Sequence, residues 1–308
     1  MRHLSHRAQG LRTARSALQA AVACLAVGWV AAALADEPVV IDGPAHPGAV
    51  FRIAGRDARV VATGFLNPCG LAADEQGTLF VADECDAGTI FKVTPEGQKS
   101  PVAANRPMPR HVAIDSERAV WHTHRPSSSP IEWLIGVSRL SPDGRVQAVT
   151  YRFGVLESPH GIALNRFGSL YVADHAKNAI YIISITAQGE VQVRALPFAF
   201  VKPTALAFSP RGDLFIACSG TGTVARITIE AVASVFARGL ESPSALAFDK
   251  DGRLFVASET NGTIRQLSPD GKTSTLFARG LVRPRGLAFD TQGNLFVTNG
   301  RPTQAKPR

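Results

Sequence analysis

Short apolar runs of four or five residues alternate with turn residues along most of this chain, and one phrase recurs. Each copy has a proline, a variable residue, an apolar run, a turn with a polar or glycine residue, and a second apolar run. The copies begin 40 to 50 residues apart, at Pro68, Pro109, Pro159, Pro203, Pro243 and Pro284. All six align without a gap over sixteen positions, which predicts a repeat architecture.

Each copy predicts two antiparallel strands, as residues 245–248 and 254–257 show on either side of the turn 249–252. A third strand follows at 262–267 and a weaker outer strand at 274–277. Four strands in about 40 residues are typical of a β-propeller blade rather than a helical solenoid. The sequence therefore predicts an all-β fold, a six-bladed β-propeller of four-stranded blades.

The last copy is incomplete, because only a short basic tail, 300–308, follows Asn299. Residues 48–53 match the third-strand phrase and 59–62 the fourth. We therefore expect the N-terminal strands to complete the last blade and close the ring, which leaves no open sheet edge between the first and last blades. The propeller is predicted to span 48–299, after a linker at 36–47.

The first 35 residues have a different pattern. Four arginines precede an apolar run that ends in Ala33, Leu34 and Ala35, as in a secretory signal peptide cleaved after Ala35. The alternative is an uncleaved membrane anchor, because the run approaches the length of a spanning helix. Either way the sequence predicts export, with a periplasmic or secreted propeller.

The net charge of +8 changes this picture little, since 29 basic and 25 acidic residues remain without the leader's four arginines. Several of the remaining cations lie in the tail, at Arg301, Lys306 and Arg308. This mild excess indicates a solvated tail rather than a surface for nucleic acid. We expect a monomer whose partner is a small molecule or a peptide.

Two columns of the repeat are polar and differ between blades, whereas the strand centres are uniformly apolar. The column after each proline holds Cys69, Arg110, His160, Thr204, Ser244 and Arg285. The column at the end of the second strand holds Asp83, His124, Asp174, Cys218, Ser258 and Asn299. Both are expected at one rim of the central tunnel, where Arg110, Arg285, Ser258 and Asn299 would bind a ligand. The alternative is that these residues bond backbone groups of neighbouring segments.

Histidines gather in the second and third copies, at His111, His122, His124, His160 and His175. If Asp83, His124, His160 and Asp174 converge, their nitrogen and oxygen atoms would hold one divalent ion, Ca²⁺, Mn²⁺ or Zn²⁺. Such an ion could polarise a carbonyl group or activate water. The competing interpretation is a set of ordinary rim histidines, because no tight ligand spacing is present.

The second copy is the longest and includes the segment 125–133, which ends in Trp133. A loop with an aromatic residue at this rim could cover a ligand, or it could be a tolerated insertion. Cys69 and Cys85 bracket one predicted hairpin and could form a disulfide in an oxidising compartment. Alternatively the mature chain carries three thiols, and Cys218 has no partner in either case.

The repeat resembles the NHL repeat, most closely at Gly161, Ile162 and Ala163, at Gly168, and over 170–174. This resemblance implies the propeller fold and says little about activity. A weaker similarity, to the gluconolactonase and senescence-marker-protein family, implies a metal-dependent lactone hydrolase, although two motifs of that family are absent. Amidating lyases resemble the chain at Pro159 and His160, which implies a zinc-binding histidine there.

The sequence therefore predicts an exported propeller that binds a small molecule or peptide at the tunnel mouth. The alternative is a metal-dependent hydrolase or lyase that uses the same central site. A phosphate-binding loop and a nucleophile elbow are both absent from the sequence.

Overall fold

The computed structural model describes residues 37–302, except 86–87, 107, 126–134, 150–154 and 187. The propeller lies within one compact unit, Val39–Arg308. The predicted leader, 1–35, lies outside the described residues. Nowhere in the described part of the chain does a helix have the length and apolar character needed to cross a membrane.

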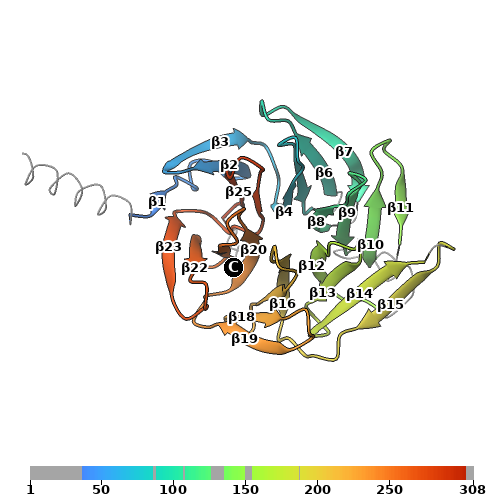
Figure 1. Cartoon of the computed structure of the whole chain (residues 1–308). Helices are drawn as coiled ribbons and strands as arrows, with labels where there is room; N and C mark the ends of the chain where they lie inside the picture. The colour runs from blue at the N-terminus through green and yellow to red at the C-terminus, as the bar shows by residue number, and fades with distance from the viewer. Residues whose placement is uncertain are drawn as a thin grey trace, which may run out of the picture. The chain divides into compact units, whose positions relative to one another are not determined.

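Six antiparallel four-stranded sheets form the blades of a ring, as predicted (Figure 1). Blade 1 contains β4 (Pro68–Ala73), β5 (Leu79–Asp83), β6 (Gly88–Val93) and β7 (Lys99–Arg106). Blade 2 contains β8 (Pro109–Ile114), β9 (Val120–His124), β10 (Gly136–Leu140) and β11 (Val146–Ala148). Blade 3 contains β12 (Pro159–Leu164), β13 (Leu170–Asp174), β14 (Ala179–Ile185) and β15 (Val191–Ala195).

The other three blades repeat the pattern. Blade 4 contains β16 (Pro203–Phe208), β17 (Leu214–Cys218), β18 (Thr223–Ile227) and β19 (Ala233–Ala237). Blade 5 contains β20 (Pro243–Phe248), β21 (Leu254–Ser258), β22 (Thr263–Leu267) and β23 (Ser274–Arg279). Blade 6 contains β24 (Leu287–Phe289), β25 (Leu295–Asn299), β2 (Ala49–Ala54) and β3 (Asp57–Ala62).

The ring closes as the sequence predicts, because β2 pairs with β25 from Ala49 opposite Asn299 to Ile53 opposite Leu295. The segment 36–47 also contains a short strand, β1 (Val39–Val40). This strand adds in parallel to β23 and covers the outer edge of blade 5. An extended segment can therefore pair with the outer edge of a blade in this fold.

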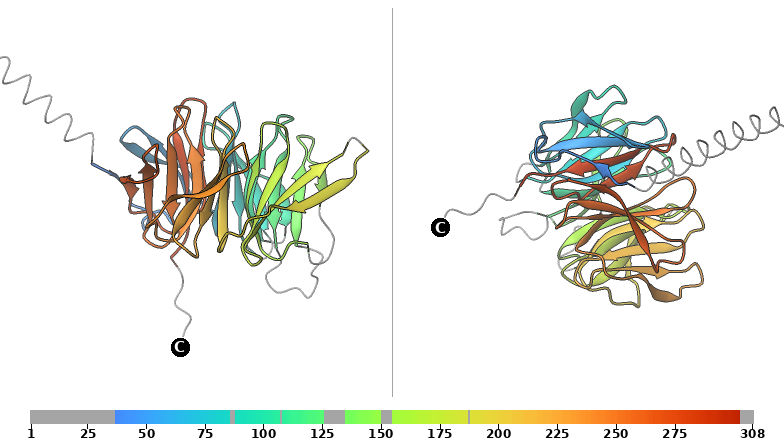
Figure 2. Two further views of the ribbon diagram at one scale, coloured as in Figure 1. Left: turned by 60° about the horizontal axis from the view of Figure 1, so that its bottom comes forward. Right: turned by 90° about the vertical axis from the view of Figure 1, so that its left-hand side faces the viewer.

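The hydrophobic core of the described residues is divided into six clusters, one between each pair of neighbouring blades. Both faces of a blade are thus buried, which explains why its strands are apolar at successive positions rather than at every second one. Ile264 and Val81 have no exposed surface. Figure 2 shows the blades standing side by side.

The innermost strands approach each other closely, and glycine makes this approach possible. A Cβ atom on Gly161 would lie 2.7 Å from the Cα of Ala205 in the next blade. The corresponding Gly70 and Gly286 are equally crowded by the backbone of the next blade. Glycine therefore follows the variable column residue in three blades because a side chain there would push the inner strands apart.

Candidate functional site

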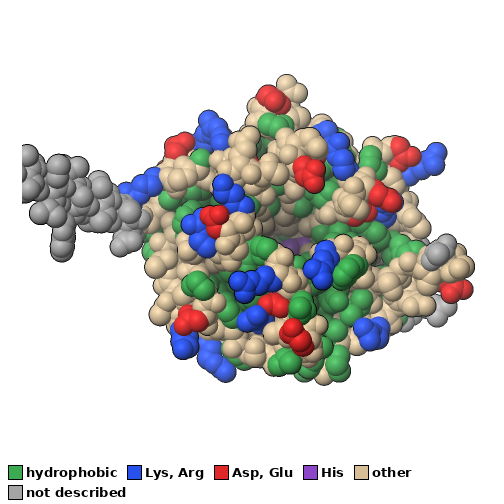
Figure 3. Space-filling model, in the orientation of Figure 1, with side chains coloured by type: hydrophobic (Ala, Val, Ile, Leu, Met, Phe, Trp, Pro, Cys, Tyr) green, Lys and Arg blue, Asp and Glu red, His purple; other side chains and the backbone are tan. Residues whose placement is uncertain are grey.

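The column after the repeat prolines lines a cavity of about 240 Å³ at the centre of the ring. All six members contribute: Cys69, Arg110, His160, Thr204, Ser244 and Arg285. Each stands near the start of the innermost strand of its blade, so the ring brings residues 216 positions apart into contact. Figure 3 shows a hollow at the centre of the ring with a histidine inside it.

The second lining column is one residue beyond the one that the sequence predicts. Glu84, His175, Ser219 and Glu259 each follow the last residue of a second strand, and all four line the cavity. Arg125 has the same place in blade 2. The signal was present in the sequence, since this column also varies between blades: Glu84, Arg125, His175, Ser219, Glu259 and Gly300.

The residues that end the second strands are buried outside the cavity, and several of them hold the segment before the repeat proline of their own blade. Asp83 accepts hydrogen bonds from the amides of Leu66 and Asn67, at 2.9 and 2.5 Å. Asp174, which has no exposed surface, accepts them from the amides of Glu157 and Ser158, and also from two amides that follow it. Both carboxylates thus satisfy buried N–H groups of their own blade.

Ser258 and Asn299, which the sequence predicts to bind a ligand, also bond to backbone groups, and neither lines the central cavity. The Ser258 hydroxyl donates to the carbonyl oxygen of Glu241. The Asn299 side chain accepts from the amide of Val282 at 2.7 Å and donates to the carbonyl oxygen of Gly43 at 2.8 Å. One partner in each case stands two residues before the repeat proline, so one structural role explains four residues of three different types.

The predicted metal site does not form. His124 is buried beside Ser138, with 3.0 Å between its Nε2 and the Ser138 hydroxyl, and Asp83 and Asp174 are engaged with backbone amides. Of the four predicted ligands only His160 lines the cavity. Among the described residues, His, Cys, Asp and Glu side chains form no group of three that could hold a metal ion. His160 also faces the Arg110 guanidinium, whose charge would repel a cation.

A buried charge network connects the two arginines of the cavity. Glu84 lies between them, with Oε1 2.9 Å from Nε of Arg110 and Oε2 2.6 Å from Nη1 of Arg285. Arg285 also contacts Glu259, which is shared with Arg283, at 2.9 Å in both cases. Burial by itself would raise the pKa of Glu84, but the two guanidinium groups lower it below its ordinary value, so Glu84 is ionised.

The structure contains no disulfide between Cys69 and Cys85, contrary to the prediction. The Cys69 thiol instead faces the cavity, where it donates to Oε2 of Glu84 at 3.2 Å and accepts from Nη1 of Arg285 at 2.9 Å. Burial raises the pKa of Cys69 to about 12, so the residue is a neutral thiol. A neutral thiol is a poor nucleophile.

Three histidines make the other side of the cavity. His160 and His175 stack with ring centres 4.6 Å apart, and His160 is in hydrogen-bond contact with Arg110. Burial, followed by the charge of Arg110, lowers the pKa of His160 far below its ordinary value. The same causes lower the pKa of His111 to about 4, and all these rings are therefore neutral at pH 7.

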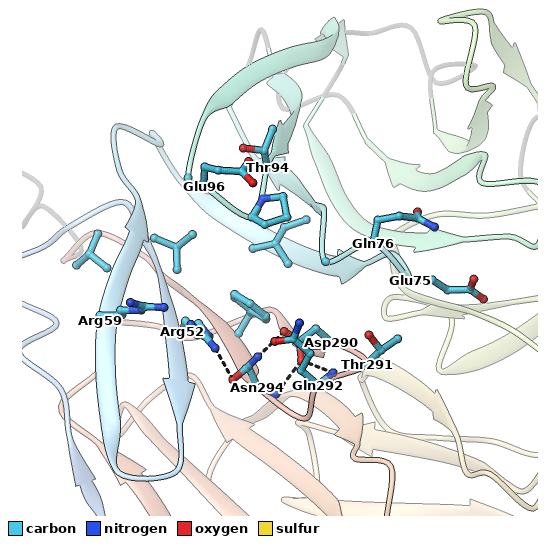
Figure 4. Close-up of a pocket in the computed structure, with 17 residues that line it drawn as sticks. Arg52, Arg59, Glu75, Gln76, Thr94, Glu96, Asp290, Thr291, Gln292 and Asn294 are labelled. Atoms are coloured by element: carbon cyan, nitrogen blue, oxygen red, sulfur yellow. Dashed lines mark hydrogen bonds between the residues drawn. The ribbon is translucent and has the colours of Figure 1, made fainter.

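A second cavity of about 360 Å³ lies at the turns of blades 6 and 1 (Figure 4). Three of its polar side chains are joined by hydrogen bonds: Arg52 donates to Asn294, and Asn294 donates to Asp290. The central cavity gathers the strongest perturbations of pKa and is the candidate functional site. Trp133, predicted to cover it, lies outside the described residues.

The fold and this cavity define a class: six-bladed propellers with a polar site at one end of the central channel. The chain is structurally similar to a gluconolactonase from Xanthomonas campestris, with a TM-score of 0.66 and 16% identity over 82% of this chain and 96% of that one. It is also similar to virginiamycin B lyase from Staphylococcus aureus, with a TM-score of 0.54 and 17% identity over 72% and 74%.

A third similar structure is the calcium-binding protein regucalcin from Agrobacterium tumefaciens, with a TM-score of 0.60 and 16% identity over 86% and 98% of the two chains. At such identities the similarity shows the fold. No protein-family model and no curated protein matches the sequence. Propellers of the gluconolactonase and NHL type therefore share this architecture, and the chemistry of the site has to be argued from its own residues.

Proposed function

We propose that this protein is an exported propeller that binds a small molecule, or the end of a peptide, through a carboxylate or carbonyl group in the central cavity. The single observation that carries this proposal is the contact of Arg110 with the neutral His160. Arg285 forms ion pairs with both Glu84 and Glu259. Arg110 pairs with Glu84, which it shares with Arg285. The Arg110 side of the cavity therefore has an excess of positive charge.

Further cations reinforce this asymmetry. Burial, and then the charges of Lys202 and Arg110, lower the pKa of His175, so the charge of Lys202 also acts on this lining histidine. An anionic oxygen placed there would gain charge-assisted hydrogen bonds without a competing carboxylate. The volume of about 240 Å³ is near the lower end of the usual range for ligand cavities, roughly 300–1,000 Å³, which favours a small ligand.

The location and assembly are part of the same proposal. The leader at 1–35 supports export to the periplasm or the medium, and a monomer suffices because one chain provides the whole cavity lining. Nucleic acid is an unsuitable partner for such a small site. The ligand is accordingly a soluble metabolite or a peptide terminus.

A second candidate is a hydrolase or lyase, since the similar structures include a gluconolactonase and virginiamycin B lyase. One feature of the cavity favours it. The neutral His160 holds the guanidinium of Arg110 through a hydrogen-bond contact, and Arg110 can polarise a substrate oxygen. The metal-dependent version finds no support in the described side chains, and the step is written for these two residues alone.

Thermal unfolding tests the binding proposal. The purified protein is titrated with hydroxy acids, their lactones and their amides, and an acid is expected to raise the melting temperature saturably. Arg110→Met should abolish this rise, whereas Arg59→Met, a change at an exposed arginine outside the cavity, should retain it. If no acid or lactone stabilises the native protein, or if both variants respond alike, the central site is not an anion site.

The same lactones test the enzyme candidate. Acid release is followed at pH 7 for the native protein, His160→Gln and Arg59→Met. Catalysis would be established if the native protein and Arg59→Met release acid and His160→Gln does not. Binding without turnover would leave a binding propeller.

A further inference from the structure

Grooves between neighbouring blades open at the turns that join the first and second strands, at the end of the blades away from the central cavity. Three of them are well formed, with volumes of about 360 Å³ between blades 6 and 1, 720 Å³ between blades 3 and 4, and 510 Å³ between blades 4 and 5. They occupy equivalent places in the repeat. Their differences therefore come from side chains and not from the fold.

The third strand supplies the side chain that crosses each groove, at the position opposite an aromatic residue of the second strand. In blade 6 this is Arg52, opposite Phe296, and it donates to Asn294 at 2.8 Å (Figure 4). In blade 4 it is Arg226, opposite Phe215, and its Nε donates to Asp213 at 2.9 Å. A basic residue paired with a polar group of its own blade closes these grooves.

Blade 3 departs from this pattern. Ile182 stands opposite Tyr171 at the same position, and both line the groove between blades 3 and 4. A second departure is Phe167, in the turn between β12 and β13, with 77% of its surface exposed. The other five blades have polar residues at this turn position: Gln76, Glu117, Arg211, Asp251 and Gln292.

The groove between blades 3 and 4 is thus apolar where its equivalents are polar. Phe198, Phe208 and Ile229 add to the lining, and Ile229 is 64% exposed. Figure 3 shows hydrophobic side chains gathered over β14 and β16. The fold does not need exposed apolar residues here, since the other blades form without them, and such a patch is typical of an interaction site.

Arginine is the only charged residue type in this lining. Arg166 and Arg194 line the groove, and within the described residues neither forms an ion pair. The guanidinium of Arg166 lies 4.8 Å from the centre of the Phe167 ring. Two carboxylates, Asp213 and Glu230, are next to lining residues in the sequence but are not part of the lining. Asp213 is already paired with Arg226, at 2.5 Å. The groove is therefore apolar with two cations that lack a carboxylate partner.

The geometry points to a docking site for an extended acidic segment of a partner protein, with an aromatic or branched aliphatic side chain in the groove and carboxylates on Arg166 and Arg194. Arg194 belongs to β15, the outermost strand of blade 3. An extended segment can pair with such an edge, as β1 does with β23 in this chain. This site is separate from the central cavity and does not depend on its function.

Fluorescence anisotropy with three labelled nine-residue peptides tests the inference. The first alternates Asp or Glu with Phe or Leu, the second replaces Phe and Leu by Ser, and the third replaces the acidic residues by Lys. We expect the first peptide to bind at least tenfold more tightly than either of the others. Equal binding of the first and second peptides would mean that charge alone acts and would overturn the proposal.

Two variants locate the site. Phe167→Gln introduces the residue that blades 1 and 6 carry at this position, and Arg194→Glu reverses a lining charge. Each variant is expected to bind the first peptide at least tenfold more weakly. Arg59→Glu, at an exposed arginine of the groove between blades 6 and 1, should change the affinity for this peptide less than twofold. Unchanged binding by both groove variants, or a dimer in sedimentation that Phe167→Gln abolishes, would overturn the peptide as occupant.

Discussion

Two polar columns of the same repeat serve opposite purposes. The column after the prolines, which includes Cys69 and His160, faces a shared cavity, whereas the column at the end of the second strand, which includes Asp83 and Asp174, is buried within each blade. Both columns vary between blades. Variation therefore marks two things in a propeller: a site shared by the blades, and a hydrogen-bonding task that several side chains can perform.

The largest effect that separates the two columns is expected at Asp174. Its carboxylate accepts hydrogen bonds from four backbone amides, so Asp174→Ala removes the acceptor of one buried and three partly buried N–H groups. We expect a loss of about 4 kcal/mol in the free energy of unfolding, measured by urea denaturation. Asp174→Asn retains one acceptor oxygen and should lose about half as much. If Asp174→Ala left the free energy of unfolding unchanged, the column would belong to ligand binding instead.

The sequence predicted most of the fold because the repeat carries its own evidence. Six aligned copies fix the strands, and the phrase at 48–53 fixes the ring closure, which the pairing of β2 with β25 confirms. The strand β1 was missed, since two residues without repeat context carry no signal. A strand this short is stabilised by its pairing with β23 and not by its own pattern.

The site could be predicted only in part. The column of Arg110 was placed correctly because it follows an invariable proline at the start of the inner strand. The second column was placed one residue early, at Asp83 instead of Glu84. Successive residues of a strand face opposite sides, but both sides of a blade are buried and apolar, so the pattern does not tell which residue faces the cavity.

The effect of pH on stability is expected to be nearly as large as that of Asp174→Ala. It comes from the histidines that line the cavity. Burial lowers the pKa of His111 from 6.5 to about 4. Between these values the unfolded chain binds a proton that the folded protein does not, so stability falls as pH decreases from 6.5 to 4. At about 1.4 kcal/mol per pH unit this amounts to about 3 kcal/mol for His111, and His160 acts in the same direction.

Urea denaturation between pH 7 and 4 measures this slope, and His111→Gln should reduce it. The carboxylate of Glu84 adds to this slope only below pH 4.5, its ordinary pKa, because its pKa is lowered in the folded protein. The slope between pH 7 and 4.5 therefore reports the histidines. A slope that His111→Gln leaves unchanged would show that this histidine is charged in the folded protein.

A smaller effect is expected from His160→Gln. His160 contacts Arg110 and stacks on His175 at the wall of an open cavity, so its removal opens little core volume. We expect the free energy of unfolding at pH 7 to change by less than about 1 kcal/mol. The variant should bind any acid that stabilises the native protein at least tenfold more weakly. A loss of stability comparable to that of Asp174→Ala would mean that the two columns do not differ in purpose.

The smallest effect is expected from Cys69→Ser. The thiol accepts a hydrogen bond from Arg285 and donates one to Glu84, and a hydroxyl can do both. The cavity is polar at this point, so the substitution should change the free energy of unfolding by less than about 0.5 kcal/mol in urea denaturation. A residue of a packed core would behave differently, because burying a hydroxyl without a partner costs about 1–3 kcal/mol. A loss of that size would place Cys69 with the buried column and reduce the shared site to the arginines and histidines.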